Sequence, residues 1–334
     1  MESPQIEMPS KFLKDVINPW LLGADPEFAI LTPPDVVVPN AEPNAVNTTK
    51  AAGAIGSDHN GRVWELRPAP SPSAYVVAIN LWKLLRQEEL SKLEKFKWKS
   101  GALGARKSQA FVPQNQPTSL EGWVQFYNNP VNGYFGVYTA QQIAHTAKQA
   151  WHNQQAQIQA AQQAALSENN VDTLGGHVHF GISVLNAMQR RALADVTIGL
   201  LNLDILPSKE NTRRLQITAH SSPKYGHLND PDAVRDCNGH VEYRCAPSWL
   251  DRPGQALAAL TAYKLAAARP SSVEWPKEQA LKARFVDWLE QLSQVDVDAW
   301  VLSDFVARKG FQEIQADPAS DFKSRWRKDN PWNG

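Results

Sequence analysis

The chain has 334 residues, of which 43% are hydrophobic and 20% are charged, and its 34 basic residues balance 34 acidic residues. This length and composition exclude a disordered or fibrous protein and indicate one large domain, or a catalytic domain with a smaller appendage. The zero formal charge gives no support to a general role on nucleic acid or at a membrane surface, so we expect neither partner.

Strands are expected from about residue 18 to residue 70. The segment LLGADPEFAIL alternates, and AIGSDHNGRVWELR places Asn60 and Gly61 between two strand-like arms, which is the strongest short-range signal for a β-hairpin. From residue 71 to about residue 97 the apolar spacing becomes that of a helix.

The middle of the chain differs in composition. Residues from about 100 to 136 are rich in Pro, Gly, Asn and Gln and indicate an irregular insertion. Residues 138–167 are rich in Ala and Gln, which are good helix formers, and predict a helix; a Gln-rich linker is the alternative. Further strands are expected at GGHVHFGISV and HVEYRCAPSWL, and an Arg-rich strand or loop precedes the second of these. Helices are expected at residues 186–206, 256–268, 277–292 and 297–307.

Strand pairs separated by helices of varied length favour an α+β fold over regular βαβ units. We expect a catalytic domain at residues 15–275, with an insertion at about 100–170, and a C-terminal helical extension at 276–334 packed on it. The aromatic, basic tail FKSRWRKDNPW is either a docking arm or a solvated helix end.

Neither a membrane anchor nor a secretion signal is visible. No apolar run approaches the roughly 20 residues that a membrane-spanning helix requires, and MESPQIEMPSKF lacks the order of a signal peptide. Two cysteines, Cys237 and Cys245, suit a reducing compartment better than a disulfide. We therefore expect a cytoplasmic protein.

Four strands carry charged residues in i, i+2 pairs, which point to the same face of a strand about 7 Å apart. If Asn60-Gly61 is a two-residue turn, Asp58 pairs with Val63 and joins the same face, whereas a three-residue loop breaks this register. Neighbouring positions are apolar, so the alternate face would pack a core. Each pair alone is ordinary for a solvated sheet face. The pairs are Asp25 and Glu27, Glu65 and Arg67, His177 and His179, and Glu242 and Arg244.

The combined set has the composition of a metal and phosphate site. Clustered carboxylates cost free energy unless a cation compensates them. Oxygen ligands with one or two imidazoles suit Mg²⁺, or Mn²⁺, better than Zn²⁺. The sequence has no GxxxxGK[ST] and no GxGxxG after a strand, so phosphates would be bound by metals and arginines. The arginines are Arg67 and Arg244, with Arg214 and Arg235 added; Arg214 is alternatively a solvated residue, and Arg235 a partner of Asp232 or Asp236.

The ordered motifs GADPEF, D-x6-ELRP, GGHVHFG and YG…R…VEYRCAPSW resemble those of the phage-encoded amidoligases over about residues 23–250. These are carboxylate–amine ligases of the glutamine synthetase and glutamate–cysteine ligase superfamily. The resemblance implies an antiparallel catalytic sheet of glutamine-synthetase type with flanking helices, whose concave face holds ATP with two or three Mg²⁺. This chain departs from the family pattern in having a longer stretch before Arg235. The resemblance says nothing about residues 100–170.

The resemblance also implies residue roles. Metal ligands would be Asp25, Glu27, Asp58, Glu65, His177 and Glu242. His179 would lie near nucleotide or substrate, and Arg244, with Arg67, would neutralise the phosphate being transferred. We therefore expect an ATP-dependent ligase that joins a small-molecule or peptide carboxylate to an amine through an acyl phosphate, in the host cytoplasm if phage-encoded. The sequence carries no signal for the oligomeric state.

Two alternatives remain open at this stage. A metal-dependent hydrolase or cupin-like enzyme would use the His-Val-His pair, although no acid follows within a few residues. A catalytically inactive phage structural or adaptor protein would keep the fold, although every metal-type position is still an acid or a histidine. A nucleophilic role for Cys245 is disfavoured, because alternation places it on the face opposite Glu242 and Arg244.

Overall fold

The computed structural model divides the chain into two compact units, Met1–Leu103 with Thr173–Gly334 and, inserted between them, Gly104–Asp172. The predicted domain limits at residues 15, 275 and 276 stay a prediction. The structure describes residues 20–32, 36–37, 47–50, 52–58, 63–100, 102–103, 117, 119–129, 139–166, 172–207, 233–273, 280–317, 321–327 and 329–332.

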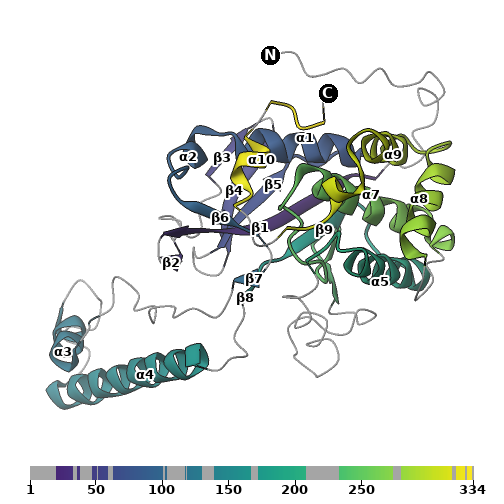
Figure 1. Ribbon diagram of the computed structural model, residues 1–334. Helices are drawn as coiled ribbons and strands as arrows, with labels where there is room; N and C mark the ends of the chain where they lie inside the picture. Colours follow the sequence, from purple (N-terminus) through teal and green to yellow (C-terminus); the bar gives the residue numbers. More distant parts are fainter. Residues whose placement is uncertain are drawn as a thin grey trace. The chain divides into compact units, whose positions relative to one another are not determined.

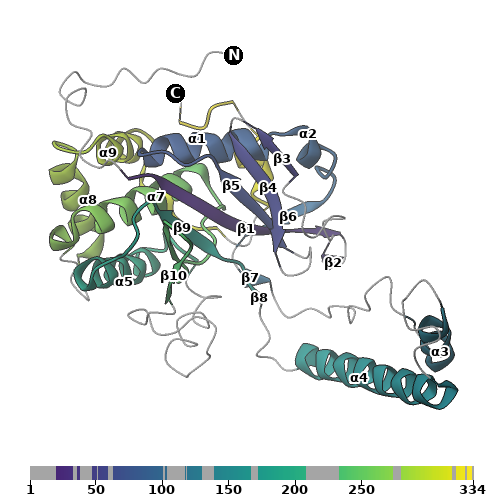
Figure 2. The same cartoon turned by 180° about the vertical axis from the view of Figure 1, so that it is seen from behind.

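The larger unit is built on a nine-stranded sheet in which every described pairing is antiparallel, as Figures 1 and 2 show from two sides. The strand order is β10-β11-β9-β1-β5-β4-β3, and β2 and β6 also pair with β1. Helices and an antiparallel sheet together confirm the α+β class. The strands are β1 Leu22–Thr32, β2 Val36–Val37, β3 Asn47–Lys50, β4 Gly53–Asp58, β5 Val63–Pro68, β6 Lys97–Lys99, β9 Gly176–Phe180, β10 Val234–Asp236 and β11 Val241–Tyr243.

The predicted register of the β4–β5 hairpin is present. Asp58 pairs with Val63 and Gly56 pairs with Glu65, as a two-residue turn at Asn60-Gly61 requires. The turn itself lies outside the described residues. This register puts Asp58 in line with Glu65 along the same side of the hairpin.

One face of the sheet packs against helices (Figure 1). Phe28, Trp64, Leu66, Val178 and Tyr243 alternate with the charged positions and are buried in the main core, which confirms the expected apolar face. Helix α7 contacts α1, α5 and α9, and its Ala- and Leu-rich surface is buried on all sides. The helices of this unit are α1 Ala74–Leu85, α2 Glu88–Ser91, α5 Ala187–Asn202, α7 Pro253–Ala268, α8 Leu281–Leu292, α9 Val297–Lys309 and α10 Lys323–Trp326, with 3-10 turns η4 Pro270–Ser272 and η5 Phe311–Ile314.

A buried charge cluster ties three of these helices together. Lys264 of α7 places its Nζ 2.5 Å from Asp298 Oδ2 and 3.2 Å from Asp296 Oδ2, at the start of α9. Asp298 also accepts hydrogen bonds from Ser73 Oγ at 2.7 Å and from Ala74 N at 2.8 Å, at the start of α1. The first turn of α1 thus gains the carboxylate that helix N-termini favour.

The aromatic residues of the C-terminal segment are buried in the core. Phe322 is fully buried and its ring lies 5.7 Å from that of Phe28 on β1, while Trp326 and Trp332 are also buried. The basic side chains of this segment donate to main-chain carbonyls: Lys323 to Glu94, Arg325 to Asp251 and Arg327 to Leu85. In the described residues from 321 onward, these aromatic side chains pack in the core, so the segment is not a fully solvated helix end; its predicted docking role stays a prediction.

The inserted unit contains two helices, α3 Leu120–Asn128 and α4 Ala140–Leu166, and the second confirms the predicted Ala/Gln-rich helix. Trp123 of α3 donates its indole N–H to Gln154 of α4 at 3.1 Å. A short pair of strands, β7 Ala102–Leu103 and β8 Asp172–Thr173, joins the two ends of the insertion. No helix in the described part of the chain is long and apolar enough to cross a membrane.

Candidate functional site

The sheet face opposite the helices gathers the charged residues that the sequence places in i, i+2 pairs. Antiparallel register brings partners from different strands directly opposite each other, where their side chains share a face. Glycines at Gly23 and Gly56 stand opposite His179 and Glu65 in these rows and leave room beside the larger side chains. The opposed pairs are Asp25 with His177, Glu27 with Glu65, His179 with Glu242, and Arg235 with Glu242.

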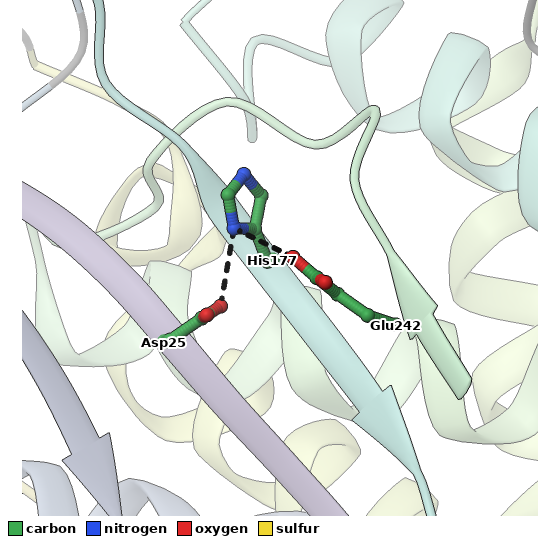
Figure 3. Close-up of side chains that lie close together, drawn as sticks. All are labelled: Asp25, His177 and Glu242. Carbon is green, nitrogen blue, oxygen red and sulfur yellow. Dashed lines mark ion pairs between the residues drawn. The ribbon is translucent and has the colours of Figure 1, made fainter. Parts of the chain in front are cut away.

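Asp25, His177 and Glu242 form the tightest group (Figure 3). His177 Nδ1 lies 3.3 Å from Asp25 Oδ1 and 3.2 Å from Glu242 Oε1. One possible ligand atom from each residue lies within 4.8 Å of the other two. The three residues come from β1, β9 and β11, so the sheet alone brings them together.

The hydrogen bonding of this group fits a divalent cation. Asp25 Oδ1 and Glu242 Oε1 are buried. Beyond their ion-pair contacts, with His177 Nδ1 for both and with Arg244 Nε for Glu242, these two oxygens have no hydrogen-bond partner. Buried polar atoms without a partner are uncommon and costly. Two carboxylate oxygens and one imidazole nitrogen are a donor set that binds Mg²⁺ or Mn²⁺. The residues present therefore fit the predicted metal.

The electrostatics around Asp25 favour an ionised acid. Burial raises the pKa of Asp25, but hydrogen bonds and charges from His177 and His179 outweigh burial and bring it well below its ordinary value. His179 Nε2 lies 3.2 Å from Asp25 Oδ2. Burial lowers the pKa of His179, and the hydrogen bond and charge of Asp25 outweigh it, so the pKa of His179 is raised. The raised pKa favours the protonated form of His179 beside Asp25.

A second acidic group lies on the β1–β5 side. Glu65 Oε1 accepts from Arg67 Nε at 2.6 Å. Burial raises the pKa of Glu65, and the charges of Asp25 and Glu27 raise it further, against the lowering effect of Arg67. Glu27 is 2% exposed, and its carboxylate accepts a hydrogen bond from the backbone N–H of Gly175.

Three arginines surround the carboxylates, two of them on Glu242. Arg235 Nη2 lies 2.5 Å from Glu242 Oε2. Of the two acids suggested from the sequence as its partner, Asp232 lies outside the described residues. Arg244 Nε lies 3.4 Å from Glu242 Oε1. The Arg235 side chain is 55% exposed and that of Arg67 is 43% exposed, so both guanidinium groups reach solvent at the rim.

A cavity of about 390 Å³ opens over this face, and every described residue that lines it is charged or polar. Such a lining suits phosphates and cations. The lining residues are Asp25, Glu65, Arg67, His177, His179, Arg235, Cys237, His240, Glu242 and Arg244.

Two lining residues, Cys237 and His240, were not predicted. They flank the turn Asn238-Gly239, in which both residues have positive φ, of 55° and 98°. Cys237 N donates to His240 O at 2.9 Å, which closes a two-residue hairpin between β10 and β11. The Asn-Gly dipeptide is the signal that finds this hairpin in the sequence. With the hairpin known, alternation puts both side chains on the face of Glu242.

Other predicted residues lie elsewhere. Arg214 lies outside the described residues, as does the side chain of Asp58, so their assigned roles stay predictions. Cys245 is 5% exposed and packs in the core, away from the cavity, as alternation predicted. Cys237 and Cys245 are both free thiols.

Comparison with known proteins points to a ligase. Residues 139–286 match the family described as Phage phiEco32-like COOH.NH2 ligase-type 2. The match includes β9 and β11, with His177 and Glu242, and excludes β1, with Asp25. Asp25, which completes the triad, therefore comes from outside the matched segment. The match supports a carboxylate–amine ligase.

No curated protein matches the chain. Among solved structures, the chain is similar to the crystal structure of a bifunctional glutathione synthetase from Pasteurella multocida, with 13% identity and a TM-score of 0.40. The similarity covers 93% of this chain and 50% of the other, so the chain spans about half the length of that protein.

Proposed function

We propose that this protein is an ATP-dependent carboxylate–amine ligase that uses Mg²⁺ or Mn²⁺ and forms an acyl-phosphate intermediate. One observation carries the proposal. Asp25, His177 and Glu242 are far apart in the sequence and meet on one sheet face with buried atoms that lack hydrogen-bond partners. The match to a carboxylate–amine ligase family supports the same class.

The divalent cation would be held by Asp25, His177 and Glu242, and Glu65, which lines the same cavity, would be a ligand for a second cation. A cation bound here supplies positive charge that polarises a phosphoryl group and offsets the charge developing on it. Asp25 is ionised at neutral pH, because its pKa lies below the ordinary value, and so is ready to ligate.

Two bonds change in the first step. An oxygen of the substrate carboxylate attacks the γ-phosphorus of ATP, an O–P bond forms, and the bond from that phosphorus to the bridging oxygen breaks, releasing ADP. Arg67 and Arg235 reach solvent at the rim, and Arg244 lies deeper beside Glu242, so guanidinium groups surround the transferring phosphate. His179 adds a further positive charge.

The second step makes the amide. The amine nitrogen attacks the acyl carbon, the C–O bond to phosphate breaks, and phosphate leaves while the amine loses a proton. No protein nucleophile is needed. Cys245 lies in the core, and burial raises the pKa of the Cys237 thiol, which keeps Cys237 protonated at neutral pH.

The test is incubation with Mg-ATP and pools of candidate carboxylates and amines. The proposal predicts ADP, phosphate and a product whose mass is the sum of two substrates minus water. Glu242→Gln should abolish turnover, whereas Glu290→Gln, at an exposed position of α8, should not change it. Release of AMP and pyrophosphate would overturn the acyl-phosphate route, and metal-dependent turnover without ATP would indicate a hydrolase instead.

A further inference from the structure

Glu27 stands apart from the other acids of the site. Its carboxylate is buried, but it is absent from the cavity lining and from the triad of ligand atoms. Instead, Glu27 Oε2 accepts the backbone N–H of Gly175, and Glu27 N donates to Gly175 O at 2.8 Å. Both main-chain groups of Gly175 are thus bonded to a single residue of β1.

The same short segment is bonded on its other side to the residues after β11. Ser248 N donates to Leu174 O at 2.9 Å, and Ser248 Oγ donates to Glu27 O at 2.6 Å. Ser248 is fully buried, so these bonds do not compete with water. Gly176 N donates to Ala246 O at 2.9 Å.

We call this set of bonds among Glu27, Leu174, Gly175 and Ser248 the interlock. It lies where the chain returns from the inserted unit to the sheet. Strand β8 ends at Thr173, Leu174 and Gly175 follow, and His177 is the second residue of β9. The position of Gly175 therefore sets where β9 begins, and with it how far the His177 imidazole reaches between Asp25 and Glu242.

We propose that Glu27 is a positioning residue that acts through Gly175 on His177, rather than a ligand of the metal. Resting on the proposed function, this inference assigns the metal to Asp25, His177 and Glu242 and gives Glu27 the task of fixing the entry of β9. Ser248 belongs to the same interlock, because it holds the main chain of Glu27 and of Leu174 together.

Two substitutions of Glu27 separate the roles. Glu27→Gln and Glu27→Ala both remove the charge, but Gln keeps an oxygen that accepts the Gly175 N–H. If Glu27 positions His177, Glu27→Gln should bind Mn²⁺ at least about tenfold more tightly than Glu27→Ala, the range in which residues that orient metal ligands act. If Glu27 ligates the metal, the two variants should bind Mn²⁺ equally weakly.

Ser248→Ala provides a second route that leaves the carboxylate intact. We expect it to weaken Mn²⁺ binding severalfold, because it loosens the same interlock. Ser293→Ala is the matched control. The Ser293 hydroxyl also donates to a carbonyl, that of Glu290, but Ser293 is the C-cap of α8 and lies far from the site residues in the sequence. Unchanged Mn²⁺ affinity in Ser248→Ala would contradict the proposal.

Amide hydrogen exchange supplies a readout independent of metal. Exchange at Gly175 and Gly176 should be faster in Glu27→Ala than in wild type and unchanged in Glu27→Gln, in the absence of Mn²⁺ and ATP. Equal exchange in wild type and Glu27→Ala would overturn the interlock. If wild type binds no Mn²⁺ while exchange behaves as expected, the metal site fails and the interlock stands. Should Glu27→Ala not fold, Glu27→Gln and Ser248→Ala still decide between the roles.

Discussion

Replacing Lys264 with methionine removes the cation from the buried cluster that joins α7, α9 and α1. Lys264 is 4% exposed and Asp298 is fully buried, with 2.5 Å between the charged atoms. Methionine fills nearly the same volume, so the main loss is electrostatic. Removing one partner of a buried ion pair typically costs about 3–5 kcal/mol, because the remaining charge is left uncompensated. At about 2–4 °C per kcal/mol for a domain of this size, the melting temperature should fall by roughly 6–20 °C.

The pH dependence gives this prediction a second readout. Burial lowers the pKa of Lys264, but the charges of Asp298 and Asp296 outweigh it, so its pKa in the folded protein is raised. Because the lysine pKa is raised on folding, its contribution to the free energy of unfolding is fully present below the unfolded pKa of about 10.4. That contribution is lost only as the pH rises through the folded pKa. Lys264 therefore stays charged in the wild-type protein at pH 9 and below. In Lys264→Met, the loss of unfolding free energy relative to wild type should become smaller toward acidic pH, because protonation removes the carboxylate charge that the variant leaves without a cation.

The assay is urea unfolding followed by tryptophan fluorescence at several pH values. Lys92→Met is the matched control, since Lys92 pairs with Glu88 on the surface at 3.5 Å, and such exposed pairs contribute less than about 1 kcal/mol. A Lys264→Met protein that unfolds within about 1 kcal/mol of wild type at every pH would refute the reasoning.

Three further predictions concern the site and its surroundings. Mn²⁺ at a hundred times its Kd should stabilise wild type by about 2.7 kcal/mol and should not stabilise Glu242→Gln, as measured in a thermal-shift assay. Equal shifts of the melting temperature in both proteins would place the metal elsewhere. Burial raises the pKa of Asp251 to about 6, so its ionisation should lower the free energy of unfolding by on the order of 3 kcal/mol as the pH rises from about 4 through 6. Asp251→Asn should remove this pH dependence, measured by denaturation at several pH values. The same pH dependence in wild type and variant would contradict the prediction. In the native protein, a small thiol reagent should modify Cys237 and spare buried Cys245, and Mg-ATP should slow the reaction; two thiols reacting at one rate would contradict the placement.

Local sequence patterns predicted the part of the site that depends on strand alternation. Period-2 spacing put His177 and His179 on one face, and Asn60-Gly61 fixed the register that aligns Asp58 with Glu65. The order in which β1, β9 and β11 lie side by side follows from tertiary packing and is not encoded in local pattern. The family resemblance implied only that the acids and histidines of these strands share one site.

Three features of the structure were not predicted from the sequence. One, the turn between β10 and β11, had a sequence signal that was not used, and the other two depend on contacts between residues distant in the chain. The Asn238-Gly239 turn was readable and would have placed His240 at the cavity. The hydrogen bond from Gly175 N to the Glu27 carboxylate could not be read from the sequence, because the two residues are 148 positions apart and local pattern carries no sign of their contact. Lys264 was hidden in the same way, as one charge within an Ala- and Leu-rich helix.

The most direct test of the central claim is to locate a bound metal. Anomalous diffraction from crystals soaked in Mn²⁺ should show a peak at about 2.2 Å from one atom each of Asp25, His177 and Glu242, and the peak should vanish in Glu242→Gln. A Mn²⁺ bound away from these three side chains, or none bound at millimolar concentration in an intact fold, would contradict the account.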